Sequence, residues 1–161
     1  MRVIVWLVEG TWPACVDAAR GYARGAGEVV LLHVDEPVAD LAHGAFAGLL
    51  GRAGSEPDPE RRLLELGGTS AAELLDAAAA RLGRPCTRLE RIGRAEREVV
   101  AAADGADLLV LARDGDRSRL GPHSLGKAVR FVVDHAPCPV LLVWPEAAPD
   151  LTTLPPPPPR P

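Results

Sequence analysis

The sequence predicts an α/β fold, in which one parallel sheet is covered by helices on both faces. Apolar runs of strand length alternate along the chain with stretches of helical spacing. Several runs have little polar alternation, which is typical of strands buried on both faces of a parallel sheet. The five expected strands are residues 3–8, 28–34, 85–92, 108–111 and 140–143. Right-handed crossovers between them make the sheet doubly wound.

The helical segments between these runs have recognisable ends. Thr11 is expected to be the N-cap of the first helix, with Pro13 in its first turn. Ser70 and Glu73 have the spacing of a capping box, and Gly83 is expected to end the helix that they open. The run at 85–92 alternates only partially, so we expect it at an edge of the sheet. The connection at 35–68 has no regular pattern and is predicted to be a lid or a poorly ordered segment.

Length and composition indicate one globular domain. A chain of 161 residues with 47% hydrophobic residues is long enough for a single core. We expect this domain to cover residues 1–145. Residues 146–161 end in PPPPPRP, which cannot build a core and favours polyproline II. This tail is interpreted as disordered, with a role as a ligand for an aromatic groove as the alternative.

Charge and composition argue against several classes of partner. The net charge of −4 disfavours a general binder of nucleic acid or of an anionic membrane. No apolar run approaches the ~20 residues of a membrane span, and the first residues do not resemble a signal peptide. Three scattered cysteines predict neither disulfides nor a zinc site, and the four histidines have no metal-ligand spacing. We therefore expect a cytoplasmic protein without a bound structural metal.

A ligand site is predicted at the crevice where strands 3–8 and 108–111 end, because open α/β sheets bind ligands there. Three arginines follow the second strand, and helix N-termini that attract anions follow both. These features suit phosphate. A solvated loop, in which Asp114 and Asp116 cancel most of the positive field, is the alternative.

Lys127 stands out because it is the only lysine of the chain. Gly121 to Lys127 matches GxxxxGK, but Ala128 lacks the hydroxyl of a P-loop, so we reject that motif. We expect Lys127 in the first turn of a helix, where its charge opposes the helix dipole unless an anion lies between them. A solvated lysine that tolerates this cost is the alternative.

Five short segments together resemble the universal stress protein family. The strongest is VVDHAPCPVLLV at 132–143, which is similar to the family's final helix and strand. Val8-Glu9-Gly10-Thr11 resembles its V-D-G-S, and Leu32-His33-Val34 resembles its L-H-V. Gly93 and Val99 resemble the ends of G-x-x-A-x-x-I, with Glu96 in place of the alanine. The fifth segment is the loop after residue 111, which resembles the family's phosphate loop.

The resemblance implies a Rossmann-like sheet of the adenine nucleotide alpha hydrolase type, with strand order 3-2-1-4-5. It implies a homodimer formed through the last strand, here Pro139, Val140, Leu141, Leu142 and Val143. In one subset of the family it implies ATP bound at G-x2-G-x9-G-(S/T). This chain departs from that motif: Ala112 replaces the first glycine, Lys127 replaces the serine or threonine, and ten residues separate Gly115 from Gly126.

The sequence therefore predicts a stress-response protein that binds ATP or AMP, with or without Mg²⁺, as a sensor or regulator. Val34 would border the adenine, Glu9 the ribose, and Gly115, Gly126 and Lys127 the phosphates. The expected binding residues are Glu9, Gly10, Thr11, Val34, Ala112, Arg113, Gly115, Gly126 and Lys127. The alternative is a dimeric interaction module that binds no nucleotide and contacts an unidentified protein partner. An enzyme is not expected beyond slow ATP hydrolysis, because no general base is placed beside a magnesium ligand.

Overall fold

The computed structural model describes residues 1–37 and 70–157, and its centre is a parallel sheet of five strands. The strand order is β3-β2-β1-β4-β5, which confirms the predicted order and fold class. The strands are β1 (Arg2–Leu7), β2 (Glu28–Asp35), β3 (Thr87–Ile92), β4 (Leu108–Ala112) and β5 (Val140–Val143). Most of the irregular connection expected at 35–68 lies outside the described residues.

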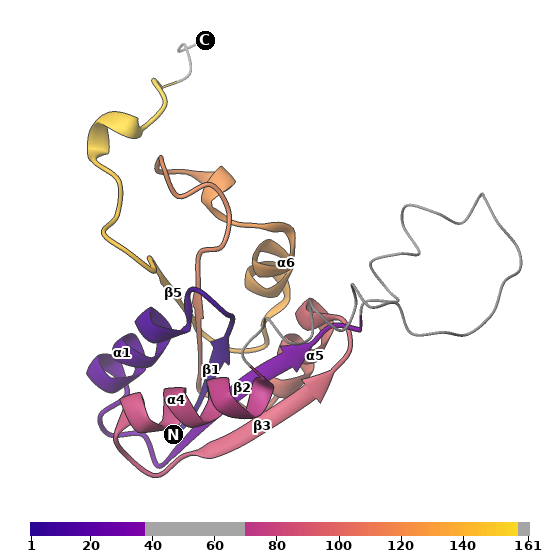
Figure 1. Cartoon of the computed structure of the whole chain (residues 1–161). Helices are drawn as coiled ribbons and strands as arrows, with labels where there is room; N and C mark the ends of the chain where they lie inside the picture. The colour runs from indigo at the N-terminus through magenta and orange to yellow at the C-terminus, as the bar shows by residue number, and fades with distance from the viewer. Residues whose placement is uncertain (38–69, 158–161) are drawn as a thin grey trace, which may run out of the picture.

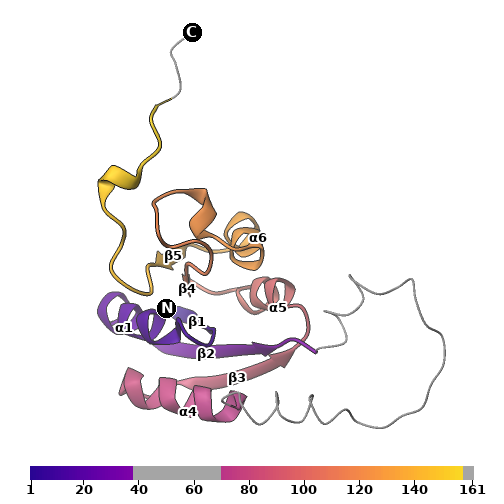
Figure 2. The same ribbon diagram turned by 45° about the horizontal axis from the view of Figure 1, so that its top comes forward.

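Within the described residues, four α-helices cover the two faces of this sheet. They are α1 (Trp12–Tyr22), α4 (Ala71–Leu82), α5 (Ala95–Ala102) and α6 (Lys127–His135). Helices α1 and α4 pack on one face, and α5 and α6 pack on the other (Figures 1 and 2). Helix α1 follows β1 on the first face, whereas α6 follows the neighbouring strand β4 on the second. The crevice of a doubly wound sheet opens at such a change of direction.

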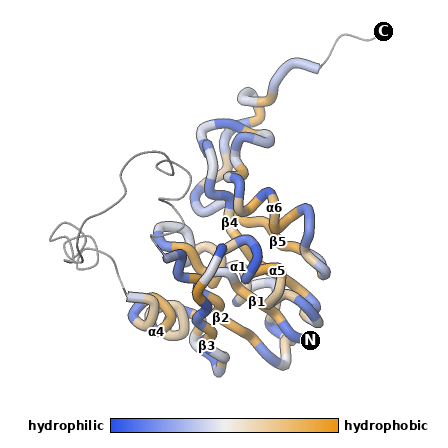
Figure 3. The backbone as a smooth tube through the Cα atoms, turned by 90° about the vertical axis from the view of Figure 1, so that its right-hand side faces the viewer, coloured by the Kyte–Doolittle hydropathy of each residue, from blue (hydrophilic) through white to orange (hydrophobic). Residues whose placement is uncertain are grey.

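The central strand β1 shows why its sequence is continuously apolar. Successive side chains of a strand point to opposite faces of the sheet. Val5 and Leu7 therefore enter the core under α1 and α4, whereas Ile4 and Trp6 enter the core under α5 and α6. Both cores consist of buried apolar side chains, and the hydrophobic colour in Figure 3 follows the inner strands accordingly. Burial on both faces fixes β1 in the middle of the sheet.

The predicted ends of α4 and the predicted start of α1 are confirmed, but the Thr11 side chain does not cap α1. Ser70 and Glu73 form the reciprocal capping box, and Gly83 ends α4 with a left-handed φ of 68°. Thr11 is the N-cap residue of α1, but its hydroxyl donates to the Val8 carbonyl (3.3 Å) and does not cap the helix. The Thr11 side chain thus closes the turn that leaves β1.

The two edge strands differ in exposure. Strand β3 has exposed or half-buried side chains throughout, which confirms its predicted edge position. Strand β5 forms the opposite edge, and its four side chains are half-buried. The hydrogen-bonding edge of β5 that faces away from β4 pairs with no other described strand. A dimer through this edge stays a prediction.

The segment after β5 is described as far as residue 157. It contains a short 3-10 helix, η2 (Leu151–Thr153), with Asp150 accepting the Thr152 N–H (2.8 Å). The Thr153 hydroxyl accepts the Leu120 N–H (3.0 Å), so this segment contacts the loop between β4 and α6. The first part of the tail that we expect to be disordered therefore has local structure, and its last residues lie outside the described part.

None of the helices in the described ranges combines the length and apolar character that a bilayer crossing requires.

Candidate ligand-binding site

A pocket of about 210 Å³ opens at the carboxyl ends of β1 and β2, beside the first residues of α5 and α6. The sequence predicts the crevice between the ends of β1 and β4; the pocket instead lies at the ends of β1 and β2, and Asp114, from the loop after β4, also lines it. Its lining combines apolar side chains with titratable groups. The lining residues are Trp6, Leu7, Val8, His33, Val34, Glu36, Ala95, Asp114 and Ala128.

The apolar lining residues of the pocket include Trp6, Val34 and Ala128. Trp6 and Val34 lie on the strand face that packs under α5 and α6, and they are 5% and 8% exposed. Their positions are fixed by the strands that carry them. This rigid apolar wall suits a flat ring, because pockets for small molecules pair apolar walls with a few oriented polar groups.

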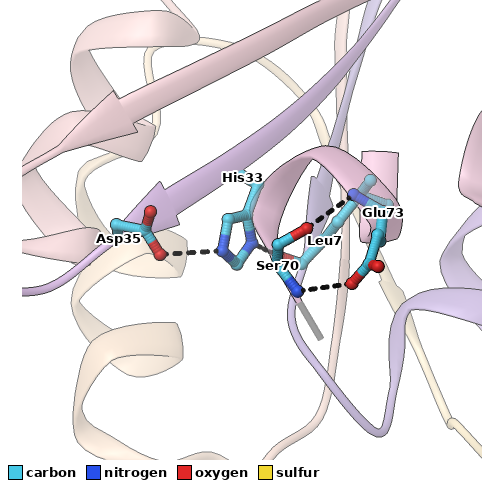
Figure 4. Close-up of polar contacts among 5 residues, drawn as sticks. All are labelled: Leu7, His33, Asp35, Ser70 and Glu73. Atoms are coloured by element: carbon cyan, nitrogen blue, oxygen red, sulfur yellow. Dashed lines mark hydrogen bonds and ion pairs between the residues drawn. The ribbon is translucent and has the colours of Figure 1, made fainter. Parts of the chain in front are cut away.

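His33 has a fixed ring at the edge of the pocket. Its Nδ1 lies 3.1 Å from the carbonyl oxygen of Leu7, and its Nε2 lies 3.3 Å from Asp35 Oδ1 (Figure 4). Both ring nitrogens therefore face oxygen atoms of the protein. The ring ties the end of β2 to the end of β1, and this contact gives it a structural role at the crevice.

Two carboxylates close the helix N-termini that border the pocket. Glu36 Oε1 accepts the Ala95 N–H of α5 (2.9 Å), and Asp114 Oδ1 accepts the Gly126 N–H at the start of α6 (2.7 Å). Helix N-termini carry partial positive charge and unpaired N–H groups, so an acidic side chain stabilises them. Each carboxylate takes a position that an external anion would otherwise use.

The loop between β4 and α6, residues 113–126, is folded back on itself. Gly115 N–H donates to the Ser124 carbonyl (2.9 Å), and Asp116 N–H donates to the His123 carbonyl (2.8 Å). A Cβ at Gly115 would lie 2.8 Å from the carbonyl carbon of Ser124. Only glycine allows this close approach. Gly115 therefore holds the loop together through its missing side chain.

The three arginines of this loop contact groups of the chain itself. The Arg113 guanidinium lies 4.5 Å from the Trp144 ring and donates to the Ser124 hydroxyl, while its Nε is buried without a hydrogen-bond partner in the described structure. Arg117 pairs with Glu146 (2.7 Å), and Arg119 pairs with Asp116 (3.5 Å). These last two pairs are exposed. Exposed pairs contribute little stability, so Arg117 and Arg119 can exchange partners more easily than Arg113.

Ser118 and Arg119 keep the Asp116 carboxylate ionised. The hydroxyl and the N–H of Ser118 donate to Asp116 Oδ1 (2.6 and 3.0 Å). These two hydrogen bonds, followed by the charge of Arg119, lower the pKa of Asp116 below its usual value. The Asp116 carboxylate thus binds Ser118 and Arg119 within the loop and does not line the pocket.

The structure brings few of the nine predicted binding residues to the pocket. Val34 is the one that lines it. Glu9, Gly10 and Thr11 form the turn between β1 and α1 and are not among the lining residues. The Ala112 methyl packs in the core under α1 and α4, on the other face of the sheet.

The remaining predicted residues lie in or next to the loop that borders the pocket. Arg113 is engaged with Trp144, and Gly115 is enclosed by the backbone of the loop. Gly126 adjoins the pocket through Asp114, whose carboxylate binds its N–H. Lys127 is the first residue of α6, as predicted; it is exposed and forms no ion pair within residues 1–37 and 70–157.

Sequence reasoning missed the two acidic lining residues, Glu36 and Asp114. A signal was present, because each follows the end of a strand by one or two residues and short acidic side chains commonly satisfy helix N-termini. The sequence does not indicate which helix N-terminus each carboxylate contacts. In the described part of the chain, no group of three or more His, Cys, Asp or Glu side chains is arranged to hold a metal ion.

The sheet order defines a Rossmann-like protein, with a pocket at the carboxyl ends of β1 and β2. The family model named "Universal stress protein family" matches residues 9–143, so this chain belongs to that family. A search of curated proteins finds no match.

Several solved structures share this fold. The universal stress protein UspA from Lactobacillus plantarum is 23% identical, with a TM-score of 0.59, and the match covers 89% of this chain and 97% of that one. A universal stress protein from Archaeoglobus fulgidus is 18% identical, with a TM-score of 0.55, and the match covers 89% and 93%. A universal stress protein solved in complex with cAMP is 17% identical, with a TM-score of 0.58, and the match covers 91% and 98%.

Proposed function

We propose that this protein binds an adenine nucleotide, AMP or ATP, in the pocket between β1, β2 and the β4–α6 loop. It acts as a sensor or regulator of a stress response in the cytoplasm and not as a fast catalyst. The observation that carries the proposal is the rigid apolar wall of Trp6 and Val34 at the crevice of the sheet. Its placement agrees with the role that the family resemblance implies for Val34.

Membership of the family and one structural neighbour support an adenine ligand. That neighbour, a universal stress protein, was solved in complex with cAMP. It is similar to this chain over most of both lengths, although their identity is low. An adenine ring suits a wall formed by an aromatic and a branched aliphatic side chain, because its face is apolar and its edge is polar.

The size of the pocket limits which part of the ligand it encloses. Its volume of about 210 Å³ is below the roughly 300–1,000 Å³ of sites that enclose a drug-sized ligand. We therefore place the base and part of the ribose inside it. The phosphates then extend toward the β4–α6 loop, where Gly126 and Lys127 lie at the start of α6.

Lys127 gives the first test of this proposal. It is exposed at the first position of α6, so its ammonium group is available to a phosphate. Replacing Lys127 with alanine is expected to weaken ATP binding at least about tenfold, a loss of roughly 1.4 kcal/mol. Titration calorimetry measures this directly. The control is Arg24→Ala, which removes one positive charge from an exposed position in the connection between α1 and β2.

Equal ATP affinity of the parent protein and the Lys127→Ala variant would remove Lys127 from the site. Equal weakening by Arg24→Ala would show that only the overall charge matters. A ligand of the native state must also raise the melting temperature by mass action. No shift in melting temperature with millimolar ATP would contradict nucleotide binding itself.

The second candidate function is a dimeric interaction module that binds no nucleotide. The open edge of β5, with its half-buried apolar side chains, favours this alternative because unpaired strand edges readily add another strand. The interface would contain Pro139 and residues 140–143. Sedimentation at micromolar protein concentration tests for the dimer. A monomer at that concentration would contradict a dimer through β5, whichever of the two candidate functions holds.

A further inference from the structure

We propose that Asp114 sets the ligand preference of this pocket, so that the uncharged nucleoside adenosine binds more tightly than AMP or ATP. The inference rests on the proposed function, because it concerns the same pocket. It adds the charge class of the preferred ligand. The observations that carry it are the position of the Asp114 carboxylate and the absence of lysine and arginine from the described lining of the pocket.

The Asp114 carboxylate occupies the position at which α6 would receive a phosphate. Its Oδ1 accepts the Gly126 N–H at 2.7 Å. A Cβ built on Gly126 would meet Oδ1 at 2.7 Å and Oδ2 at 2.9 Å, so both oxygens lie against the Gly126 backbone. The N-terminus of a helix is an anion site because its N–H groups and its dipole both attract negative charge. Here the protein supplies that anion itself.

The other helix N-terminus at the pocket is closed in the same way. Glu36 Oε1 accepts the Ala95 N–H at the start of α5, and Glu36 and Asp114 both line the pocket. A phosphate that extends toward the N-terminus of either helix therefore meets a carboxylate. Like charges at short range disfavour each other, and because Glu36 and Asp114 are exposed, salt screens this repulsion.

The basic side chains near the pocket do not offset this repulsion. The described lining contains neither lysine nor arginine. Arg113 is held by Trp144 and Ser124, and Arg117 is paired with Glu146. Lys127 is available, but Asp114 already supplies the anion that the first turn of α6 favours. A phosphate must displace Asp114 from Gly126 before it gains the same N–H group.

The test compares adenosine with AMP on the full chain and on Asp114→Asn. Asparagine keeps a side-chain oxygen that can accept the Gly126 N–H, but it removes the charge. We expect the parent protein to bind adenosine more tightly than AMP. In Asp114→Asn, AMP binding should strengthen about tenfold, whereas adenosine binding should stay within about twofold. Calorimetry gives both affinities.

Asp116→Asn is the matched control. It removes the same charge from the same loop, but the Asp116 carboxylate is bound by Ser118 and Arg119 and does not line the pocket. It should change AMP affinity by less than about twofold. AMP binding that Asp114→Asn leaves unchanged, or that both variants strengthen equally, would overturn the inference.

Ionic strength provides a second measurement that needs no variant. Salt screens repulsion between exposed charges, so AMP affinity for the parent protein should rise relative to adenosine affinity as salt increases. A relative fall, or tighter binding of AMP than of adenosine at low salt, would overturn the inference and leave the proposed function standing. Failure of every form to bind either ligand would overturn both.

Discussion

The turn after β1 and the loop after β4 leave neighbouring strands at the same edge of the sheet, yet they are built differently. The turn, residues 8–11, is closed by N–H groups of Thr11 and Trp12 that donate to the Val8 carbonyl (3.1 and 3.0 Å). The first turn of α1 has no acidic residue and no side-chain cap. The loop, residues 113–126, forms its own hydrogen bonds and places Asp114 at the start of α6.

This difference shows that the loop after β4, and not the turn after β1, contributes to the charge of the pocket lining. The turn shapes the exit of β1 but contributes only Val8 to the pocket, whereas the loop contributes a charge. A long loop satisfies most of its polar groups internally, so its function depends on the few groups that point into the crevice. In this protein that group is a carboxylate and not one of the three arginines.

The largest effect is expected for Gly115→Ala in the loop. Its new Cβ would lie 2.8 Å from the carbonyl carbon of Ser124 and 3.0 Å from that of Leu125, both of which are backbone atoms. The loop must shift, at a cost of about 2–3 kcal/mol of unfolding free energy. Chemical denaturation measures this cost. A change below about 0.5 kcal/mol would show that the loop is not held by this close approach.

A smaller effect is expected for Gly10→Ala in the turn. Gly10 has a φ of 82°, and a Cβ there would meet no atom within 4 Å. The cost is therefore backbone strain alone, about 1–2 kcal/mol. Gly25→Ala is the control, because it is equally open without the left-handed φ. Equal stability changes in the two variants would contradict the assigned strain.

The smallest effect is expected from acidification of the loop. The pKa of Asp116 is lowered in the folded state, so its contribution to stability is present above the ordinary carboxyl pKa. That contribution is lost as the pH falls through the lowered folded value. Amide exchange at Ser118, whose N–H binds Asp116, should report this loss. Asp116→Asn should abolish the pH dependence, and an unchanged dependence would assign it to another group.

The fold was predictable because its signals are local and repeated. The apolar run of β1 indicates burial on both faces, and the partial alternation of β3 indicates an edge. Ser70 and Glu73 mark the start of α4 by their spacing alone. Thr11 shows the limit of such signals, because its hydroxyl can serve either the helix or the preceding turn. The structure selects the turn.

The site was less predictable because its contacts join segments that are distant in the sequence. Val34 was predicted because Leu32-His33-Val34 resembles the family's L-H-V. The partners of Arg113, which are Ser124 and Trp144, come from the loop and from beyond β5, and no spacing rule connects them. From the sequence, Asp114 was interpreted as a negative charge that offsets the positive charge of the loop arginines. Its reach to Gly126 follows only from how the loop folds back.

The most direct test of the account asks whether an adenine ligand lies against Trp6. The chain has three tryptophans, and Trp6 alone lines the pocket within the described residues. In a variant with Trp12→Phe and Trp144→Phe, titration with adenosine or AMP should change the Trp6 fluorescence saturably. The midpoint should match the calorimetric dissociation constant. Calorimetric binding that leaves the Trp6 signal unchanged would place the ligand elsewhere and contradict the account.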